Sequence, residues 1–196
     1  MAAVRRPGDR GSAGSRERGT AERSSSPNVP QALERYRRVG LDTIVFIYHL
    51  SNHPLYAPIT AGIFASIESG RISAVTSSLA LIEILSRPKQ LGHQAAVDSY
   101  RAALATFPHL ELRRSDIAVT EQAADLRGRY RLAIPEAIQL ATAIVDGAEA
   151  FVGNAPALRG VREIDVVLLD DLRAAARSAA NGSGRRAASS PFRTRA

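Results

Sequence analysis

The stretch AIPEAIQLATAIVDGAEAFVGNAPAL, residues 133–158, decides the fold class of this chain. Pro135 stands where the first residue of a helix is expected, because its fixed φ suits that position and its missing N–H would have no partner there. Gly147 is the residue type that most often ends a helix. The apolar run Ala150–Val152 follows after a short turn and predicts a strand. A helix followed closely by a short apolar strand indicates an α/β fold.

The same alternation continues on both sides of this stretch. Short apolar runs that predict strands lie at Val39–Asp42, Ile72–Val75, Leu110–Leu112 and Val166–Leu169. Helical patterns separate them, at Thr43–Leu50, Ile59–Ser69, from Ser77 or Ser78 to Leu85, Ala95–Thr106 and Ile117–Tyr130. Strands that alternate with helices favour a largely parallel sheet. We therefore expect an α/β domain built around such a sheet.

The composition excludes several classes of protein. A chain of 196 residues suits one domain of about 100 to 150 residues with extensions. The absence of Cys excludes disulfides, a thiolate nucleophile and Cys-ligated zinc. The longest uncharged run, Thr43–Ile67, contains two His and two Pro and is a poor membrane span. No apolar segment follows the basic start, so we expect a cytoplasmic protein with no membrane association.

The positive charge of the chain lies at its two ends. Residues 1–40 carry a net charge of +5 and residues 173–196 carry +6, whereas the middle of the chain is negative. The first thirty residues are rich in Gly, Ser, Pro and Arg without apolar periodicity, which is typical of disorder. We predict a disordered tail over residues 1–37, a domain over residues 38–173 and a disordered basic tail over residues 174–196.

Three carboxylates are each the only formal charge in a long apolar segment: Asp42 in residues 39–67, Glu83 in residues 72–86 and Glu136 in residues 132–145. An unpaired carboxylate is costly inside a fold. Two of them about 4 Å apart would repel by roughly 4 kcal/mol at an effective dielectric constant of about 20. A divalent cation would remove that repulsion, so the sequence suggests a buried acidic metal site.

The predicted elements place these acids near one edge of the sheet. Asp42 ends the first strand, Glu83 lies one to two turns into the helix after the second, and Glu136 lies in the first turn of a later helix. In open parallel sheets, ligands bind outside the carboxyl ends of the strands.

Each acid also has a structural alternative. Asp42 could cap the helix at Thr43, Glu136 could favour the positive end of its helix, and Glu83 could lie on an exposed helix face.

Four segments in order resemble the PIN domain, and most of all the bacterial VapC-type toxins: LDTIVFIY (41–48), AVTSSLALIEIL (74–85), residues 133–158 quoted above, and VVLLDDL (166–172). The resemblance implies a three-layer α/β/α domain with a mainly parallel five-stranded sheet. It further implies clustered acids that bind Mg²⁺ or Mn²⁺ and cleave RNA. Asp42, Glu83 and Glu136 match three of the four acidic positions, as metal ligands and catalytic residues.

The resemblance also implies an RNA substrate and admits two protein partners, a small antitoxin and a second copy in a homodimer. The chain departs from the family pattern at the fourth acidic position, where Thr-Asn-Asp is usual and Gly153-Asn154-Ala155 stands here. Ile44 replaces the usual polar residue after Asp-Thr. Two functions remain open: a Mg²⁺-dependent ribonuclease, as the toxin of a toxin–antitoxin pair with lowered activity, or a degenerate PIN domain that binds RNA or protein without cutting.

Overall fold

The computed structural model describes residues 31–186, so most of the predicted N-terminal tail and residues 187–196 lie outside it. Within this range the chain forms a five-stranded, all-parallel sheet in the order β3-β2-β1-β4-β5. This confirms the predicted α/β class with its mainly parallel five-stranded sheet. The strands are β1 (Arg38–Leu41), β2 (Ser73–Ser77), β3 (Leu110–Arg113), β4 (Ala150–Gly153) and β5 (Asp165–Leu168).

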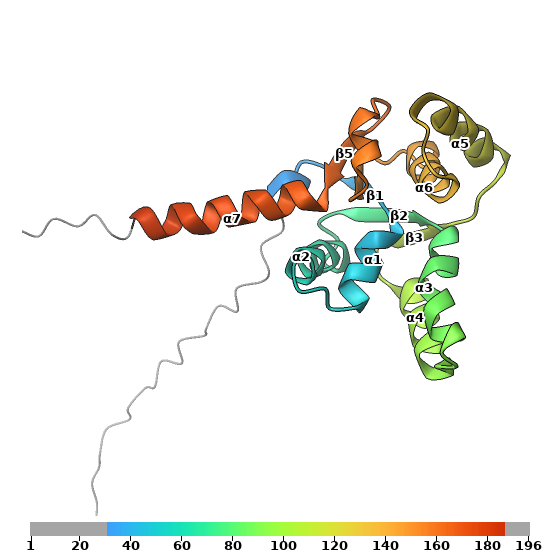
Figure 1. Ribbon diagram of the computed structural model, residues 1–196, viewed down its shortest axis with the longest axis horizontal. Helices are drawn as coiled ribbons and strands as arrows, with labels where there is room; N and C mark the ends of the chain where they lie inside the picture. Colours follow the sequence, from blue (N-terminus) through green and yellow to red (C-terminus); the bar gives the residue numbers. More distant parts are fainter. Residues whose placement is uncertain (1–30, 187–196) are drawn as a thin grey trace, which may run out of the picture.

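Helices cover both faces of the sheet, as Figure 1 shows, with α1 to α4 on one face and α5 and α6 on the other. Two hydrophobic clusters correspond to these faces, one centred on α1, α2 and the α3–α4 pair, the other on α5 and α6. The helices are α1 (Thr43–Leu50), α2 (Ala57–Glu68), α3 (Leu79–Gln90), α4 (Gln94–Thr106), α5 (Ile117–Tyr130), α6 (Ile134–Val145) and α7 (Leu169–Arg186), with 3-10 turns at Gln31–Leu33 and Pro156–Gly160.

The central strand β1 is buried from both sides, as its short apolar sequence predicts. Val39 and Leu41 face the cluster on the α1 side and are almost fully buried. Gly40 faces α6, and a Cβ at this position would overlap the side chain of Ala143. The missing side chain therefore lets α6 pack directly against the middle of the sheet.

Helix α3 is longer than its pattern predicts. It continues past Leu85 to Gln90 and contains Pro88, which removes one N–H from the helical hydrogen bonds. Ile84, Leu85 and Pro88 are all buried on this helix, so their packing offsets the loss of that bond. Tertiary contacts thus override the local stop signal.

Described elements extend past both predicted domain boundaries, at residues 38 and 173. Leu33 is fully buried and Tyr36 is 6% exposed, so the hydrophobic core includes residues before Arg38. At the other end, α7 continues to Arg186. The buried residues Leu169 and Leu172 anchor the first turn of α7, and the Ala-rich sequence that follows favours its extension. Beyond that anchor α7 projects away from the domain (Figure 1).

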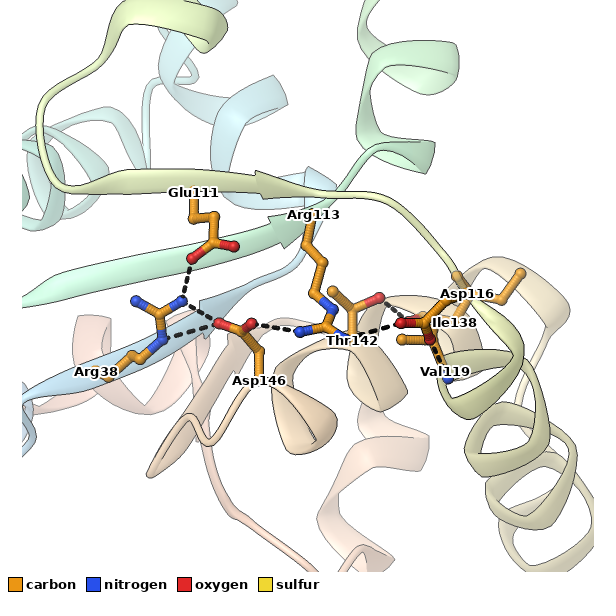
Figure 2. Close-up of polar contacts among 8 residues, drawn as sticks. All are labelled: Arg38, Glu111, Arg113, Asp116, Val119, Ile138, Thr142 and Asp146. Atoms are coloured by element: carbon orange, nitrogen blue, oxygen red, sulfur yellow. Dashed lines mark hydrogen bonds and ion pairs between the residues drawn. The ribbon is translucent and has the colours of Figure 1, made fainter.

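An ion-pair network fixes the C-terminal end of α6 to the sheet (Figure 2). The carboxylate of Asp146, which follows α6, accepts hydrogen bonds from Arg38 Nε at 2.9 Å and from an Arg113 guanidinium nitrogen at 2.7 Å. Glu111 and Asp116 pair with the outer sides of these two arginines. The network thus links the C-terminal end of α6 to β1 and β3.

Across residues 31–186, none of the helices combines the length and the apolar character that crossing a membrane requires.

Candidate functional site

Asp42 occupies the junction between β1 and α1 at the carboxyl edge of the sheet. Its backbone N–H donates to the carbonyl of Val152 at 2.9 Å and so continues the pairing with β4. Its Oδ1 accepts a hydrogen bond from Ile44 N–H at 3.1 Å, which makes it the N-cap of α1. The capping role considered from the sequence is therefore present. It engages only one carboxylate oxygen, so it is compatible with ligand binding by the other.

Gly153 makes room for the second oxygen of Asp42. A Cβ at Gly153 would lie 3.1 Å from Asp42 Oδ2 and 2.9 Å from Leu158 Cδ1. The contact with Leu158 would require that side chain to shift, and the contact with Asp42 is tighter than most Cβ contacts. The departure from the family pattern at this residue is thus coupled to the position of the Asp42 carboxylate.

Glu83 is exposed on α3, and its carboxylate has a hydrogen-bond partner on α6, the helix on the other face of the sheet. Its Oε2 accepts a hydrogen bond from Gln139 Nε2 at 3.1 Å. Gln139 is on α6, about one turn after Glu136. This contact brings the second and third predicted acids toward the same place, although they are 53 residues apart in the chain.

Glu136 is half-buried in the first turn of α6. Its Oε2 accepts a hydrogen bond from the Ala133 N–H at 3.1 Å. The carboxylate therefore satisfies a free backbone donor at the start of the helix, which is the structural role considered from the sequence. As at Asp42, this role engages one oxygen.

Gln139 belongs to the site but is not among the residues that the sequence predicts for it. Its side chain is 3% exposed and lies within hydrogen-bonding contact of Thr43, Thr76 and Glu83. The available signal was a single amide in the apolar sequence of α6. That signal does not reveal its partners, because they lie on α1, β2 and α3.

Burial and uncompensated negative charge together set the electrostatics of this edge. The pKa of Asp42 is raised from 3.8 to about 6, first by burial and then by the charges of Glu83 and Glu136, while the Ile44 N–H opposes the shift. Within the described residues, none of these three acids forms an ion pair with Lys or Arg. The fold therefore brings the acids near one another without supplying a cation.

The side chains present suit a hard divalent cation in chemistry, although not in their present arrangement. Carboxylate oxygens are the ligands that Mg²⁺ prefers. In residues 31–186, however, no group of three or more Asp, Glu, His or Cys side chains is close enough to hold a metal ion. Glu83 and Glu136 each use one oxygen, Oε2, in a hydrogen bond within the protein, and no hydrogen bond within the described residues engages the other oxygen of either carboxylate.

The fourth acidic position carries no carboxylate. Ala155 packs against the cluster around α5 and α6. Asn154 Oδ1 accepts a hydrogen bond from the backbone N–H of Asp170 at 3.0 Å. The Asp170 side chain is directed elsewhere, because it accepts from Tyr56 at 2.6 Å and pairs with Arg173. Asp170 therefore lies beside Asn154 without replacing the missing acid.

A shallow groove of about 300 Å³ adjoins Glu83 on the helical surface. Its wall is mostly apolar, with residues from α1, α3 and α4, and Arg87 lies in it one turn after Glu83. The groove thus combines apolar surface, one predicted site acid and one guanidinium at the edge of the acidic cluster.

A five-stranded parallel sheet between two helical layers, with acids near the carboxyl ends of its strands, agrees with the PIN-like fold inferred from the sequence. The sequence model of the PIN domain matches residues 39–155. The chain belongs to the PIN domain family.

Solved structures with the same fold include two toxin–antitoxin assemblies. A toxin-antitoxin complex from Klebsiella pneumoniae contains a chain that is 21% identical, with a TM-score of 0.52, and the match covers 67% of this chain and 97% of that one. VapBC2 from Rickettsia felis, bound to a DNA fragment from its promoter, contains a chain that is 15% identical, also with a TM-score of 0.52, covering 67% and 98%. At these identities the likeness shows the fold. No curated protein sequence matches this chain.

Proposed function

We propose that the protein is a divalent-metal-dependent ribonuclease, with Asp42, Glu83 and Glu136 as the ligands of Mg²⁺ or Mn²⁺. The observation that carries this proposal is the uncompensated charge around Asp42, whose pKa is raised to about 6 by burial and by two neighbouring carboxylates. Three carboxylates without a cation would repel an RNA phosphate. Membership of the PIN family makes RNA the substrate that this edge suits best.

Each acid in this proposal has a residue that orients it. The Ile44 N–H holds Oδ1 of Asp42, Gln139 holds Glu83, and the Ala133 N–H holds Glu136. A bound divalent cation would stabilise charge on the phosphate and make a water molecule more acidic. A proton competes with the cation for Asp42, whose pKa is raised to about 6 in the metal-free protein, so we expect cleavage at limiting metal concentration to rise as the pH increases toward this value.

We further propose that the protein is the toxin of a toxin–antitoxin pair and acts in the cytoplasm. The fold it shares with chains of two toxin–antitoxin assemblies supports this proposal. The partner would be a small antitoxin, and a homodimer is the second assembly to test. Co-expression with the product of an adjacent small reading frame, followed by measurement of the mass of the purified complex, distinguishes the two partners.

A degenerate PIN domain that binds RNA or a protein without cutting is the second candidate function. It is favoured by the sequence Gly153-Asn154-Ala155, which places an uncharged alanine at the fourth acidic position. It is also favoured by the spacing of the acids, since no group of three or more potential ligands within residues 31–186 is close enough to hold a metal ion.

Cleavage of a labelled structured RNA by the full chain, with Mg²⁺, Mn²⁺ or a chelator, decides between these functions. We expect cleavage that requires the metal and is lost in Asp42→Asn. The matched control is Asp125→Asn, which neutralises an exposed carboxylate of α5 far from the site and should cleave like the wild type. RNA binding without cleavage under any of these conditions would support the degenerate alternative.

A further inference from the structure

The side chain of Gln139 is a deeply buried polar group beside the acidic site. It is 3% exposed, and its neighbours along α6, Ala137 and Leu140, are buried as well. A buried amide is costly unless its donors and acceptor are satisfied, so its contacts decide what it does.

The two ends of this amide contact different sides of the site. Oε1 lies 3.4 Å from Thr76 Oγ1, which itself donates to the carbonyl of Leu41 at 2.8 Å. Nε2 donates to Thr43 Oγ1 and, at 3.1 Å, to Glu83 Oε2. Leu41 and Thr43 are the two residues that flank Asp42. The amide therefore contacts the Thr43 hydroxyl directly and the Leu41 carbonyl through Thr76, and it links both to the carboxylate of Glu83.

We propose that Gln139 is a positioning residue, which holds Glu83 at a fixed place relative to Asp42 so that both can take the same divalent cation. This inference rests on the proposed function. Glu83 is exposed and has a long side chain, and without a partner it would occupy many rotamers. A ligand that is already ordered loses less conformational entropy when it binds the ion.

The neutral charge of this residue is part of its role. An Arg or Lys in its place would also hold Glu83, but it would cancel the charge that attracts the cation. An amide donates a hydrogen bond to the carboxylate and leaves that charge intact. It also adds no further repulsion to a site that already contains three acids.

The test compares Gln139→Met, which keeps the size of the side chain but removes its donor, with a matched control on the same helix. The control is Thr142→Val, because Thr142 is equally buried and bonds only to the carbonyl of Ile138. By calorimetric titration of the full chain with Mn²⁺, we expect Gln139→Met to weaken the affinity by about 10- to 100-fold. Thr142→Val should leave it unchanged, and the KM for RNA should be unchanged in both.

Gln139→His adds a rescue arm, because an imidazole N–H can donate to Glu83, and it should recover part of the Mn²⁺ affinity. A double-mutant cycle with Glu83→Ala, which removes the acceptor, measures the contact without metal or RNA. We expect the unfolding midpoints of Gln139→Met, Glu83→Ala and the double variant to be non-additive.

Wild-type Mn²⁺ affinity in Gln139→Met, or additive midpoints in the cycle, would overturn the positioning role while leaving the proposed function intact. Absence of any Mn²⁺ binding by the wild type would instead contradict the proposed function, and with it the role of Gln139 toward a metal. The two failures are therefore distinguishable.

Discussion

The carboxylates near the two ends of α6 differ in how the protein treats their charge. Asp146, at the C-terminal end, has a side chain only 9% exposed. Burial opposes its ionisation, but hydrogen bonds and charge from Arg38 and Arg113 outweigh burial and lower its pKa. Asp42, near the N-terminal end, is also largely buried, yet burial and two further acids raise its pKa to about 6.

The comparison shows that burial alone does not determine the state of a carboxylate in this fold. Arg38 begins the short strand β1 and Asp42 directly follows it, and Arg38 forms its ion pair with Asp146 rather than with Asp42. The protein thus compensates one acid internally and leaves the other uncompensated. A difference of this kind is expected if Asp146 belongs to a structural ion pair and Asp42 belongs to the proposed metal site.

The largest expected effect comes from removing the uncompensated charge itself. Asp42→Asn should lower RNA cleavage by about 1,000-fold, since a bound metal contributes several kcal/mol and each 1.4 kcal/mol is tenfold in rate. The asparagine can still accept the Ile44 hydrogen bond, so the fold should survive. Rate measurements under single-turnover conditions check this, and cleavage within threefold of wild type would contradict the assignment of Asp42.

Removing the compensated carboxylate should affect stability instead of cleavage. Asp146→Asn leaves Arg38 and Arg113 facing each other without their shared partner, and we expect a loss of roughly 3 kcal/mol in the free energy of unfolding. Urea denaturation measures it. The matched control is Glu111→Gln, because this exposed partner of Arg38 should contribute less than about 1 kcal/mol. Equal losses in both variants would show that Asp146 has no special role.

The two acids should also give opposite pH dependence in metal-free protein. The folded state raises the pKa of Asp42 from 3.8 to about 6, so it binds more protons than the unfolded state, and stability should fall by about 2 kcal/mol as the pH rises from 4 to 7. The pKa of Asp146 is lowered, so its contribution is present above the unfolded pKa and is lost as the pH falls below about 4.

Thermal melts of the wild type, Asp42→Asn and Asp146→Asn across this pH range separate the two contributions. Asp42→Asn should remove the decline toward neutral pH and retain the acid loss, and Asp146→Asn should do the reverse. Identical pH profiles in all three proteins would show that neither carboxylate controls stability.

The smallest effect is expected where the family pattern is already broken. Ala155→Asp should raise cleavage by about tenfold, at the lower end of the range for supporting ligands, if position 155 still faces the site. Without metal it should lower the melting temperature, because a further carboxylate adds repulsion. Parallel melts with and without Mn²⁺ measure this difference, and a variant that Mn²⁺ does not stabilise more than the wild type would contradict the prediction.

The sequence predicted the features that depend on local pattern. The bounds of α1 and α5 agree with their periodicity, and the carboxyl-end position of Asp42 follows from the strand that precedes it. The course of α7 was missed because the excess of Arg suggested disorder, whereas two buried leucines anchor a helix there. Gln139 was missed because its partners are distant in the sequence. Thr76 lies 63 residues before it and Thr43 lies 96 residues before it, and such pairings arise only from the fold.

Gly153 sets the order in which this chain could regain the family's usual residues. Any side chain at position 153 would meet both Asp42 and Leu158. Position 155 already carries a Cβ, so Ala155→Asp does not create this overlap at position 153. Gly153→Thr requires the Leu158 side chain or the Asp42 carboxylate to shift. The effect of Gly153→Thr therefore depends on the residue at position 158, and a library of variants selected for cleavage should yield substitutions at position 155 before any at position 153.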